Sequence, residues 1–170
     1  MLAIDNLKNK IKICPQCFKS FEPFDPSASF RAGAAQGREN VCSICSDNSR
    51  DKSKICIVEK EVDLETIENT HRYKGLYFIL GGVLGALEKN KPELEERLEN
   101  LINQIEKEKP AEIILALNPT QEGKKTTLFI KRKLAPTSIS LTELAIGLPL
   151  GGELEYADED TIVSALNNRK

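Results

Sequence analysis

Residues 41–59 read VCSICSDNSRDKSKICIVE, and two different sequence patterns meet in this stretch. It begins with the close cysteine pair Cys42 and Cys45 and ends with the apolar run 55–58, which stops at Glu59. A short apolar run bounded by polar residues is typical of a buried strand. The stretch therefore predicts a joint between a small cysteine-containing module and a domain built on a sheet.

Four of the five cysteines form two C-x2-C pairs, Cys14 with Cys17 and Cys42 with Cys45. Two such pairs offer four thiolates to a tetrahedral zinc ion, and a site closed by four thiolates leaves no position for water. The pattern therefore predicts a structural zinc rather than a catalytic one. Two disulfides, or cysteines that are only buried, are the alternatives. Cys56 lies within the apolar run and is expected to be a core residue.

The N-terminal part is expected to contain two regions. Residues 1–12 are predicted to form a helix, and residues 13–54 a four-cysteine zinc finger. The residues between the two cysteine pairs, 18–41, contain several prolines and glycines and show little periodicity, so they are predicted to form a long surface loop.

After residue 54 the pattern alternates between apolar strands and amphipathic helices, with Asp63 as the expected N-cap of the first helix. Such alternation predicts an α/β fold, with a mostly parallel sheet covered by helices on both faces. We assign residues 55–150 to this domain and 151–170 to a C-terminal segment and helix. The predicted strands are 55–58, 76–80, 112–117 and 138–144, and the predicted helices are 63–69, 92–107, 121–134 and 158–167.

The carboxyl ends of the predicted strands carry few acidic side chains. Glu59 follows the first strand, whereas the third ends in Asn118, Pro119 and Thr120, with Glu122 just beyond. A Mg²⁺-dependent nuclease needs several carboxylates converging on the metal. Glu59 and Glu122 alone make a weak set, so two interpretations stand: a strand-end carboxylate hydrogen-bonded to a neighbouring loop, or one ligand of a nuclease site.

Charge is unevenly distributed along the chain, whose formal net charge is −2 and whose pI is about 5.6. Residues 1–54 contain 9 Lys and Arg against 6 Asp and Glu, and residues 55–170 contain 15 against 20. Attraction to phosphate is therefore expected from the N-terminal third, and binding of DNA by this chain alone should be weak. The sequence has no signal-peptide pattern and no apolar window long enough to span a membrane, so we expect a cytoplasmic protein.

Four further motifs follow the cysteine pairs: IVE (57–59), ILGG (79–82), LNPTQEG (117–123) and GLPLGGELEYAD (147–158). Taken in order with the cysteine pairs, these motifs resemble the RecR family of bacterial recombination mediators. The resemblance implies a zinc finger, held by the four paired cysteines, followed by a Toprim domain. It also implies a non-catalytic scaffold that acts with RecO and RecF to load RecA onto single-stranded DNA. Where catalytic Toprim domains carry Asp-x-Asp, this chain has Asn118-Pro119-Thr120, so Glu59, Asn118 and Glu122 would mark a vestigial site or a partner contact.

The chain also departs from that family. The family's N-terminal helix-hairpin-helix domain, which contributes to DNA binding and to a tetrameric ring, is missing before Cys14, and Lys124 and Ile146 replace the usual Glu and Arg. We therefore expect a homodimer, formed with help from residues 147–158, rather than a ring. The competing hypotheses are a Mg²⁺-dependent Toprim nuclease and a zinc-ribbon interaction module that does not bind DNA.

Overall fold

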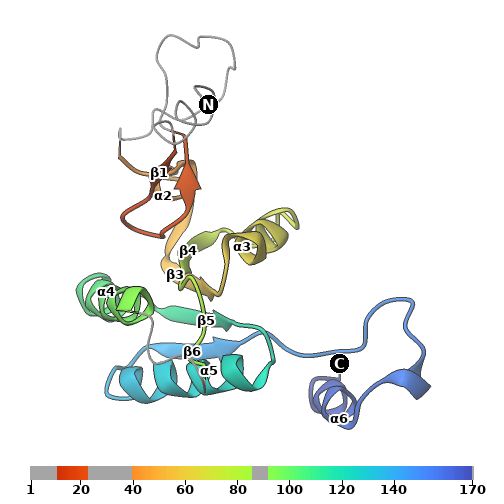
Figure 1. Cartoon of the computed structure of the whole chain (residues 1–170). Helices are drawn as coiled ribbons and strands as arrows, with labels where there is room; N and C mark the ends of the chain where they lie inside the picture. The colour runs from red at the N-terminus through yellow and green to blue at the C-terminus, as the bar shows by residue number, and fades with distance from the viewer. Residues whose placement is uncertain (1–10, 23–39, 86–91, 170) are drawn as a thin grey trace, which may run out of the picture.

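A four-stranded parallel sheet and a smaller cysteine module make up most of the molecule (Figure 1). This computed structural model describes residues 11–22, 40–85 and 92–169. The strands of the sheet are β3 (Asp51–Val58), β4 (Gly75–Ile79), β5 (Glu112–Ala116) and β6 (Ser140–Glu143). The helices that follow them are α3 (Glu61–Glu68), α4 (Pro92–Glu108), α5 (Gln121–Leu134) and α6 (Glu159–Asn167).

The strands lie in the order β4-β3-β5-β6, and every neighbouring pair is parallel. The chain first moves from β3 to its neighbour β4 through α3, and then crosses back over β3 to reach β5 through α4. Because crossover connections are right-handed, reversing the direction places the next helices on the opposite face of the sheet. The ends of β3 and β5 therefore meet where the connections diverge, a position at which parallel sheets commonly bind ligands.

Alternate residues of the strands form two separate hydrophobic cores, as the period of two in a strand requires. On one face, Ile55 and Ile57 pack in a cluster with residues of α4 and α5. On the other face, Cys56 and Val58 pack in a cluster that contains Leu64 of α3 and three of the paired cysteines. The prediction of an α/β fold with a parallel sheet covered on both faces is confirmed.

Strand β4 is buried along its whole length although it lies at the edge of the sheet. The cysteine module covers this edge, because the backbone N–H of Ile79 donates to the carbonyl of Cys17 at 2.9 Å. Figure 1 shows the module beyond the ends of β3 and β4, coloured red to orange. An exposed strand edge invites pairing with other chains, so covering it also protects the fold.

Several element boundaries differ from the predictions. Strand β3 begins at Asp51, inside the region assigned to the zinc finger. Its buried second half is the predicted strand 55–58, and its exposed first half, which we call the arm of β3, has no apolar run that could have predicted it. The prediction of Asp63 as the N-cap of α3 is wrong, because the N-cap is Lys60. The Asp63 carboxylate instead accepts a hydrogen bond from the backbone N–H of Lys60 at 2.9 Å. Helix α5 has the predicted bounds. Residues 1–10 of the helix expected over residues 1–12, and most of the loop 18–41, lie outside the described residues. The predicted end of that helix is wrong, because Lys12 belongs to the strand β1 (Lys12–Ile13).

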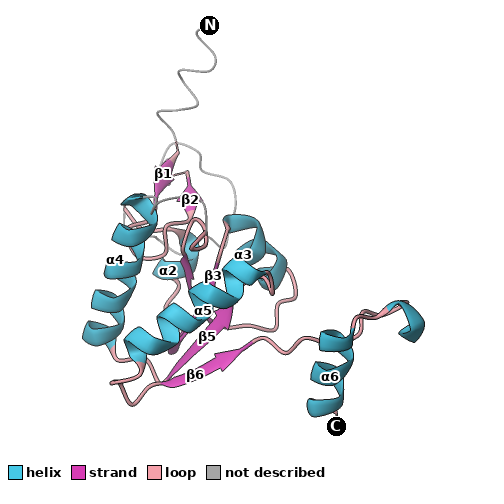
Figure 2. Ribbon diagram, turned by 60° about the horizontal axis from the view of Figure 1, so that its bottom comes forward, coloured by secondary structure: helices cyan, strands magenta, loops and turns pink. Residues whose placement is uncertain are grey.

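The chain beyond β6 leaves the sheet and extends to one side (Figures 1 and 2). It contains the short 3-10 helix η1 (Leu154–Tyr156) and then α6, whose N-cap is Asp158. No residue of either helix is buried. The exposed apolar side chains of this segment are Leu144, Ile146, Leu148, Leu150, Leu154, Tyr156, Val163 and Leu166.

Candidate functional site

The four paired cysteines come together at the N-terminal end of the described chain. Cys14 and Cys17 lie between the short antiparallel strands β1 (Lys12–Ile13) and β2 (Ser20–Phe21), and the other pair is carried by α2 (Ser43–Ser46). Their four sulfur atoms all lie within 4.8 Å of one another. Four sulfurs bound to one zinc at 2.3 Å would be about 3.8 Å apart, so the cluster has the dimensions of a tetrahedral metal site.

The sulfur contacts are those of metal ligands rather than of disulfides. The Sγ atoms of Cys17 and Cys42 are 3.5 Å apart, whereas a disulfide bond requires about 2.05 Å, and the structure joins no two of the five cysteines. The contact with Cys17 lowers the pKa of Cys14, and the contact with Cys14 raises the pKa of Cys17. Cys14, Cys17 and Cys42 are buried and Cys45 is half-buried, so four thiolates here would repel each other strongly without a central cation. The cluster can therefore hold a metal ion, and zinc fits its ligand set.

Cys56 stands apart from this set, as predicted. It lies in β3 with 2% of its surface exposed, and it packs in the core on the face that the cysteine module covers. Burial raises the pKa of the Cys56 thiol to about 12. It is therefore a neutral packing residue of the sheet.

One side of the cysteine module is seated on β4 by an aromatic contact. The residue after Cys17, Phe18, has a left-handed backbone with φ of 61°, which turns its ring toward the sheet. The rings of Phe18 and Phe78 meet edge to face, with centroids 5.3 Å apart. The guanidinium of Arg97, from α4, lies 4.7 Å from the centroid of the Phe18 ring. The loop that carries Cys17 is thus in direct contact with both the sheet and a helix.

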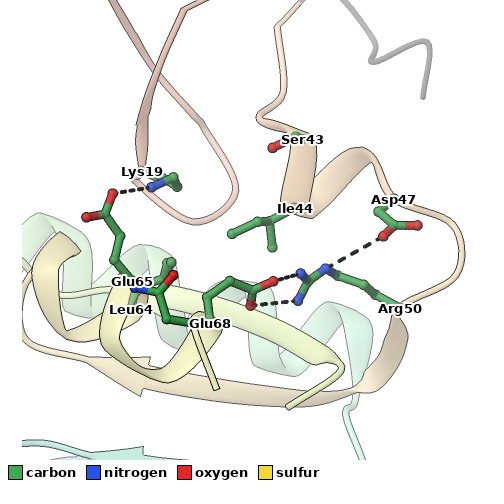
Figure 3. A pocket seen from close by; sticks show the side chains of 9 residues that line it. Lys19, Ser43, Ile44, Asp47, Arg50, Leu64, Glu65 and Glu68 are labelled. Carbon is green, nitrogen blue, oxygen red and sulfur yellow. Dashed lines mark hydrogen bonds and ion pairs between the residues drawn. The ribbon is translucent and has the colours of Figure 1, made fainter. Parts of the chain in front are cut away.

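The other side of the module is held to α3 by charged side chains, which line the cleft drawn in Figure 3. Lys19 pairs with Glu61 at 3.1 Å and with Glu65 at 3.2 Å. On the opposite side of the cleft, Arg50 makes a two-pronged contact with the carboxylate of Glu68. Because Arg50 is only 10% exposed, this pair is better shielded from water than a surface ion pair.

Sequence patterns did not identify these contacts. Lys19 and Glu61 are separated by 42 positions, and Arg50 and Glu68 by 18, so no local spacing relates them. The hydroxyl of Tyr77 also donates to Glu68 at 2.9 Å. Nothing in the sequence distinguishes Arg50 from the neighbouring cations Lys52 and Lys54.

At the carboxyl edge of the sheet, the structure brings Glu59 and Asn118 together. The Asn118 Nδ2 donates to Glu59 Oε2 at 2.9 Å, and the ammonium of Lys60 lies 3.2 Å from Glu59 Oε1. Glu59 is 7% exposed, so both partners offset the burial of its charge. Of the two interpretations of Glu59, a strand-end carboxylate hydrogen-bonded to a neighbouring loop predicts a contact of this kind.

Glu122 is not brought into this contact. It lies in the first turn of α5, and its carboxylate makes no hydrogen bond or ion pair with Glu59 or Asn118. Among residues 11–22, 40–85 and 92–169, the four cysteines are the one group of three or more His, Cys, Asp or Glu side chains placed to hold a metal ion. In the same parts of the chain, no helix has both the length and the apolar character that a membrane span requires.

Family models and known proteins match most of the chain. The family model of the Toprim domain matches residues 53–145, and the model described as RecR, C-terminal, matches residues 147–170. A protein named "Recombination protein RecR" from Bifidobacterium animalis subsp. lactis is 39% identical over 168 residues, covering 99% of this chain and 76% of the relative. Its namesake from Rubrobacter xylanophilus has the same identity and coverage. The namesake from Porphyromonas gingivalis is 42% identical over 130 residues, covering 76% of this chain and 62% of the relative.

Proposed function

This chain belongs to the RecR family of recombination proteins, and on that premise we propose that it is a non-catalytic mediator of recombinational DNA repair. In this role it is a scaffold that acts with RecO- and RecF-type proteins to help load RecA onto single-stranded DNA. The observation that carries the proposal is the match of 39% identity over 99% of the chain, spanning the cysteine module, the sheet and the C-terminal segment. Such a role places the protein in the cytoplasm, where the chromosome is.

The test is a pull-down of the tagged chain with purified RecO and RecF from the same genome. We expect at least one of them to be retained, and retention to survive substitution of Glu59 by Gln. If neither partner is retained under conditions in which a longer RecR relative binds them, the scaffold role is wrong. A partner that is lost only with Glu59→Gln would assign Glu59 and Asn118 to the partner contact.

The surroundings of Glu59 support a role without catalysis. Its carboxylate is engaged by Asn118 and Lys60, and Glu122 lies outside that contact. A two-metal mechanism would require more anionic ligands than these. The competing hypothesis, a Toprim nuclease, predicts Mg²⁺-dependent cleavage of DNA that disappears in Glu59→Gln. We expect no cleavage by the unsubstituted chain, with an active Toprim nuclease as the positive control.

We further propose that the metal is a structural zinc and that three parts follow the N-terminal residues 1–12. Four thiolates close the coordination sphere, so no position is left for a catalytic water. The zinc finger comprises residues 13–54 with its long loop, the Toprim domain comprises 55–150, and the C-terminal segment comprises 151–170. The limits of the two family models, 53–145 and 147–170, lie close to this division.

The exposed apolar side chains after β6 support a homodimer. Single exposed apolar residues are common, but a whole segment of them marks an interaction surface. We propose that residues 147–158 contribute to this contact. Light scattering should give the mass of two chains, and the double substitution Leu150→Asp and Leu154→Asp should reduce it to one. A monomeric unsubstituted chain at micromolar concentration would contradict this.

A further inference from the structure

The charge on helix α5 has the opposite sign to that on the other long helices of the described chain. Helices α3, α4 and α6 each contain more acidic than basic residues. Helix α5 contains one acidic residue, Glu122, and five basic ones. The basic residues are Lys124, Lys125, Lys131, Arg132 and Lys133. In a chain whose net charge is −2, this is a local concentration of positive charge.

These cations point away from the core. The buried residues of α5 face the sheet, and Lys124, Lys125, Arg132 and Lys133 are exposed. Since an α-helix has 3.6 residues per turn, Lys125, Leu128 and Arg132 lie along one line of the outer surface. Figure 2 shows α5 crossing in front of β5, with no other described element over its outer side. We call the outer surface formed by Lys124, Lys125, Leu128, Arg132 and Lys133 the α5 face.

Internal ion pairs neutralise only part of this charge. Lys124 lies 3.4 Å from Asp160 of α6 in a contact where both side chains are exposed, and Lys131 pairs with Glu143. No carboxylate of the described residues is within ion-pair distance of Lys125, Arg132 or Lys133. The exposed pair of Lys124 is weak, because water screens it. The α5 face therefore remains available to an external anion.

The stability of helix α5 explains the position of only some of its basic residues. Cations in the last turn, such as Arg132 and Lys133, favour a helix because they complement the negative end of its dipole. Lys124 and Lys125 lie near the opposite end, where the dipole disfavours positive charge. Their position works against the helix, so it is better explained by a ligand of the α5 face than by folding.

The geometry of the α5 face points to an extended polyanion. Lys125 and Arg132 are seven residues apart, which corresponds to about 10 Å along the helix axis. Successive phosphates along one strand offer each of these two cations an anion of its own. The one aromatic side chain of the helix, Phe129, is partly buried and has the Lys133 ammonium 5.7 Å from its ring centroid. The face consequently has no free ring on which a base could stack.

We propose that the α5 face binds the phosphate backbone of DNA without reading its sequence. This inference rests on the proposed function, because a recombination protein acts on DNA and so meets its phosphate backbone. It adds a second basic region to the N-terminal one expected from the charge distribution. Because the contact is purely electrostatic, it should be sensitive to salt, and it should accept single and double strands alike.

The test is the binding of fluorescent single- and double-stranded oligonucleotides, measured by anisotropy at several salt concentrations. We compare the full chain with the variant carrying Lys125→Glu and Arg132→Glu. At low salt we expect the variant to bind at least tenfold more weakly. The slope of log K against log salt should also become shallower by about 1.4 for single strands and about 1.8 for duplex, for two lost phosphate contacts. Lys125→Gln with Arg132→Gln tests the same contacts without added repulsion.

The matched control carries Arg72→Glu and Lys74→Glu, which change the net charge equally but lie in the exposed loop between α3 and β4. We expect its affinity to change less than twofold. Equal weakening in the control, an unchanged slope in the α5 variants, or no DNA binding by the unsubstituted chain at low salt would each overturn the inference. The inference would also be overturned if the α5 variants lost self-association while their DNA binding was unchanged. The α5 face would then contact an acidic helix of a second copy of the chain. Retention of RecO or RecF by these variants would show that the proposed function stands independently.

Discussion

Gly123 shows how a single residue shapes the carboxyl edge of the sheet. It lies in the first turn of α5, where its N–H donates to the side chain of the N-cap Thr120 at 3.1 Å. A Cβ atom at this position would lie only 1.9 Å from the carbonyl oxygen of Asn118. The turn that carries Asn118 is therefore packed directly on the backbone of the helix. This close packing aims the Asn118 amide at Glu59.

Replacing Gly123 by Ala should consequently disturb this edge. The methyl group must displace backbone atoms, so we expect a loss of about 1–3 kcal/mol in the free energy of unfolding, despite the better helix propensity of Ala. Urea denaturation measures the loss. The matched control is Gly82→Ala, because a Cβ there would meet nothing within 4 Å. Equal stability of the two variants would mean that the turn is free to move.

Residue types and spacing predict part of the candidate site. The cysteine pairs predict the metal cluster because ligand pairs are local in sequence, and the end of an apolar run identifies Glu59 as a strand-end carboxylate. The hydrogen bond between Glu59 and Asn118 could be anticipated only as an unspecified loop contact. The contacts of Lys19 and Arg50 could not be predicted, because each depends on how two separate elements dock.

Among elements, the docking of the cysteine module on α3 depends most on one carboxylate. Glu68 accepts hydrogen bonds from Arg50 and from the hydroxyl of Tyr77, and Arg50 also donates to the carbonyl of Gly75 at 3.0 Å. The carboxylate thus connects the arm of β3, helix α3 and strand β4. Sequence patterns predicted α3 and β4 and both bounds of α5, but not the arm of β3 that begins at Asp51. Their lateral contacts follow from tertiary packing.

Substituting Glu68 by Ala should destabilise the protein more than loss of a surface ion pair would. It leaves a guanidinium that is 10% exposed without its carboxylate, and we expect a loss of about 1–3 kcal/mol. The comparison variant is Asp160→Ala, which removes the exposed partner of Lys124 and should lower stability by less than about 1 kcal/mol. Urea denaturation of both variants provides the measurement. A smaller effect for Glu68→Ala than for Asp160→Ala would contradict the docking role.

The same carboxylate should make docking sensitive to acid. Burial works against ionisation of Glu68, but hydrogen bonds from Arg50 and Tyr77 outweigh it and hold the pKa of Glu68 below the usual 4.5. A lowered folded-state pKa stabilises the fold above the unfolded value, and this stability is lost as the pH falls through the folded pKa. The melting temperature should therefore fall below about pH 4.5, and fall less steeply in Glu68→Gln. An identical acid dependence in both proteins would assign the effect to other carboxylates.

At the scale of the whole molecule, the metal cluster and the sheet share one core. Three of the paired cysteines belong to the same buried cluster as Cys56, Tyr77 and Leu64. The carbonyl of Cys17, a member of the cysteine cluster, accepts the Ile79 hydrogen bond that closes the edge of the sheet. Metal binding is therefore expected to stabilise more than the module that holds the ion, because loss of the ion frees the edge of β4.

Removing the metal should accordingly be detectable in the sheet. We expect Cys42→Ser to lose its zinc, measured by atomic absorption, and the Ile79 amide to exchange with deuterium at least tenfold faster, which corresponds to about 1.4 kcal/mol. Amides of β6, at the far edge, should keep most of their protection, because β5 and β3 separate them from the module. The control Cys56→Ala removes a buried thiol outside the ligand set, so its zinc content should be unchanged. If Cys42→Ser kept its zinc, Cys42 would not be a ligand. If it lost zinc without exposing Ile79, the contacts of Phe18, Lys19 and Arg50 would hold the module on the sheet without the metal.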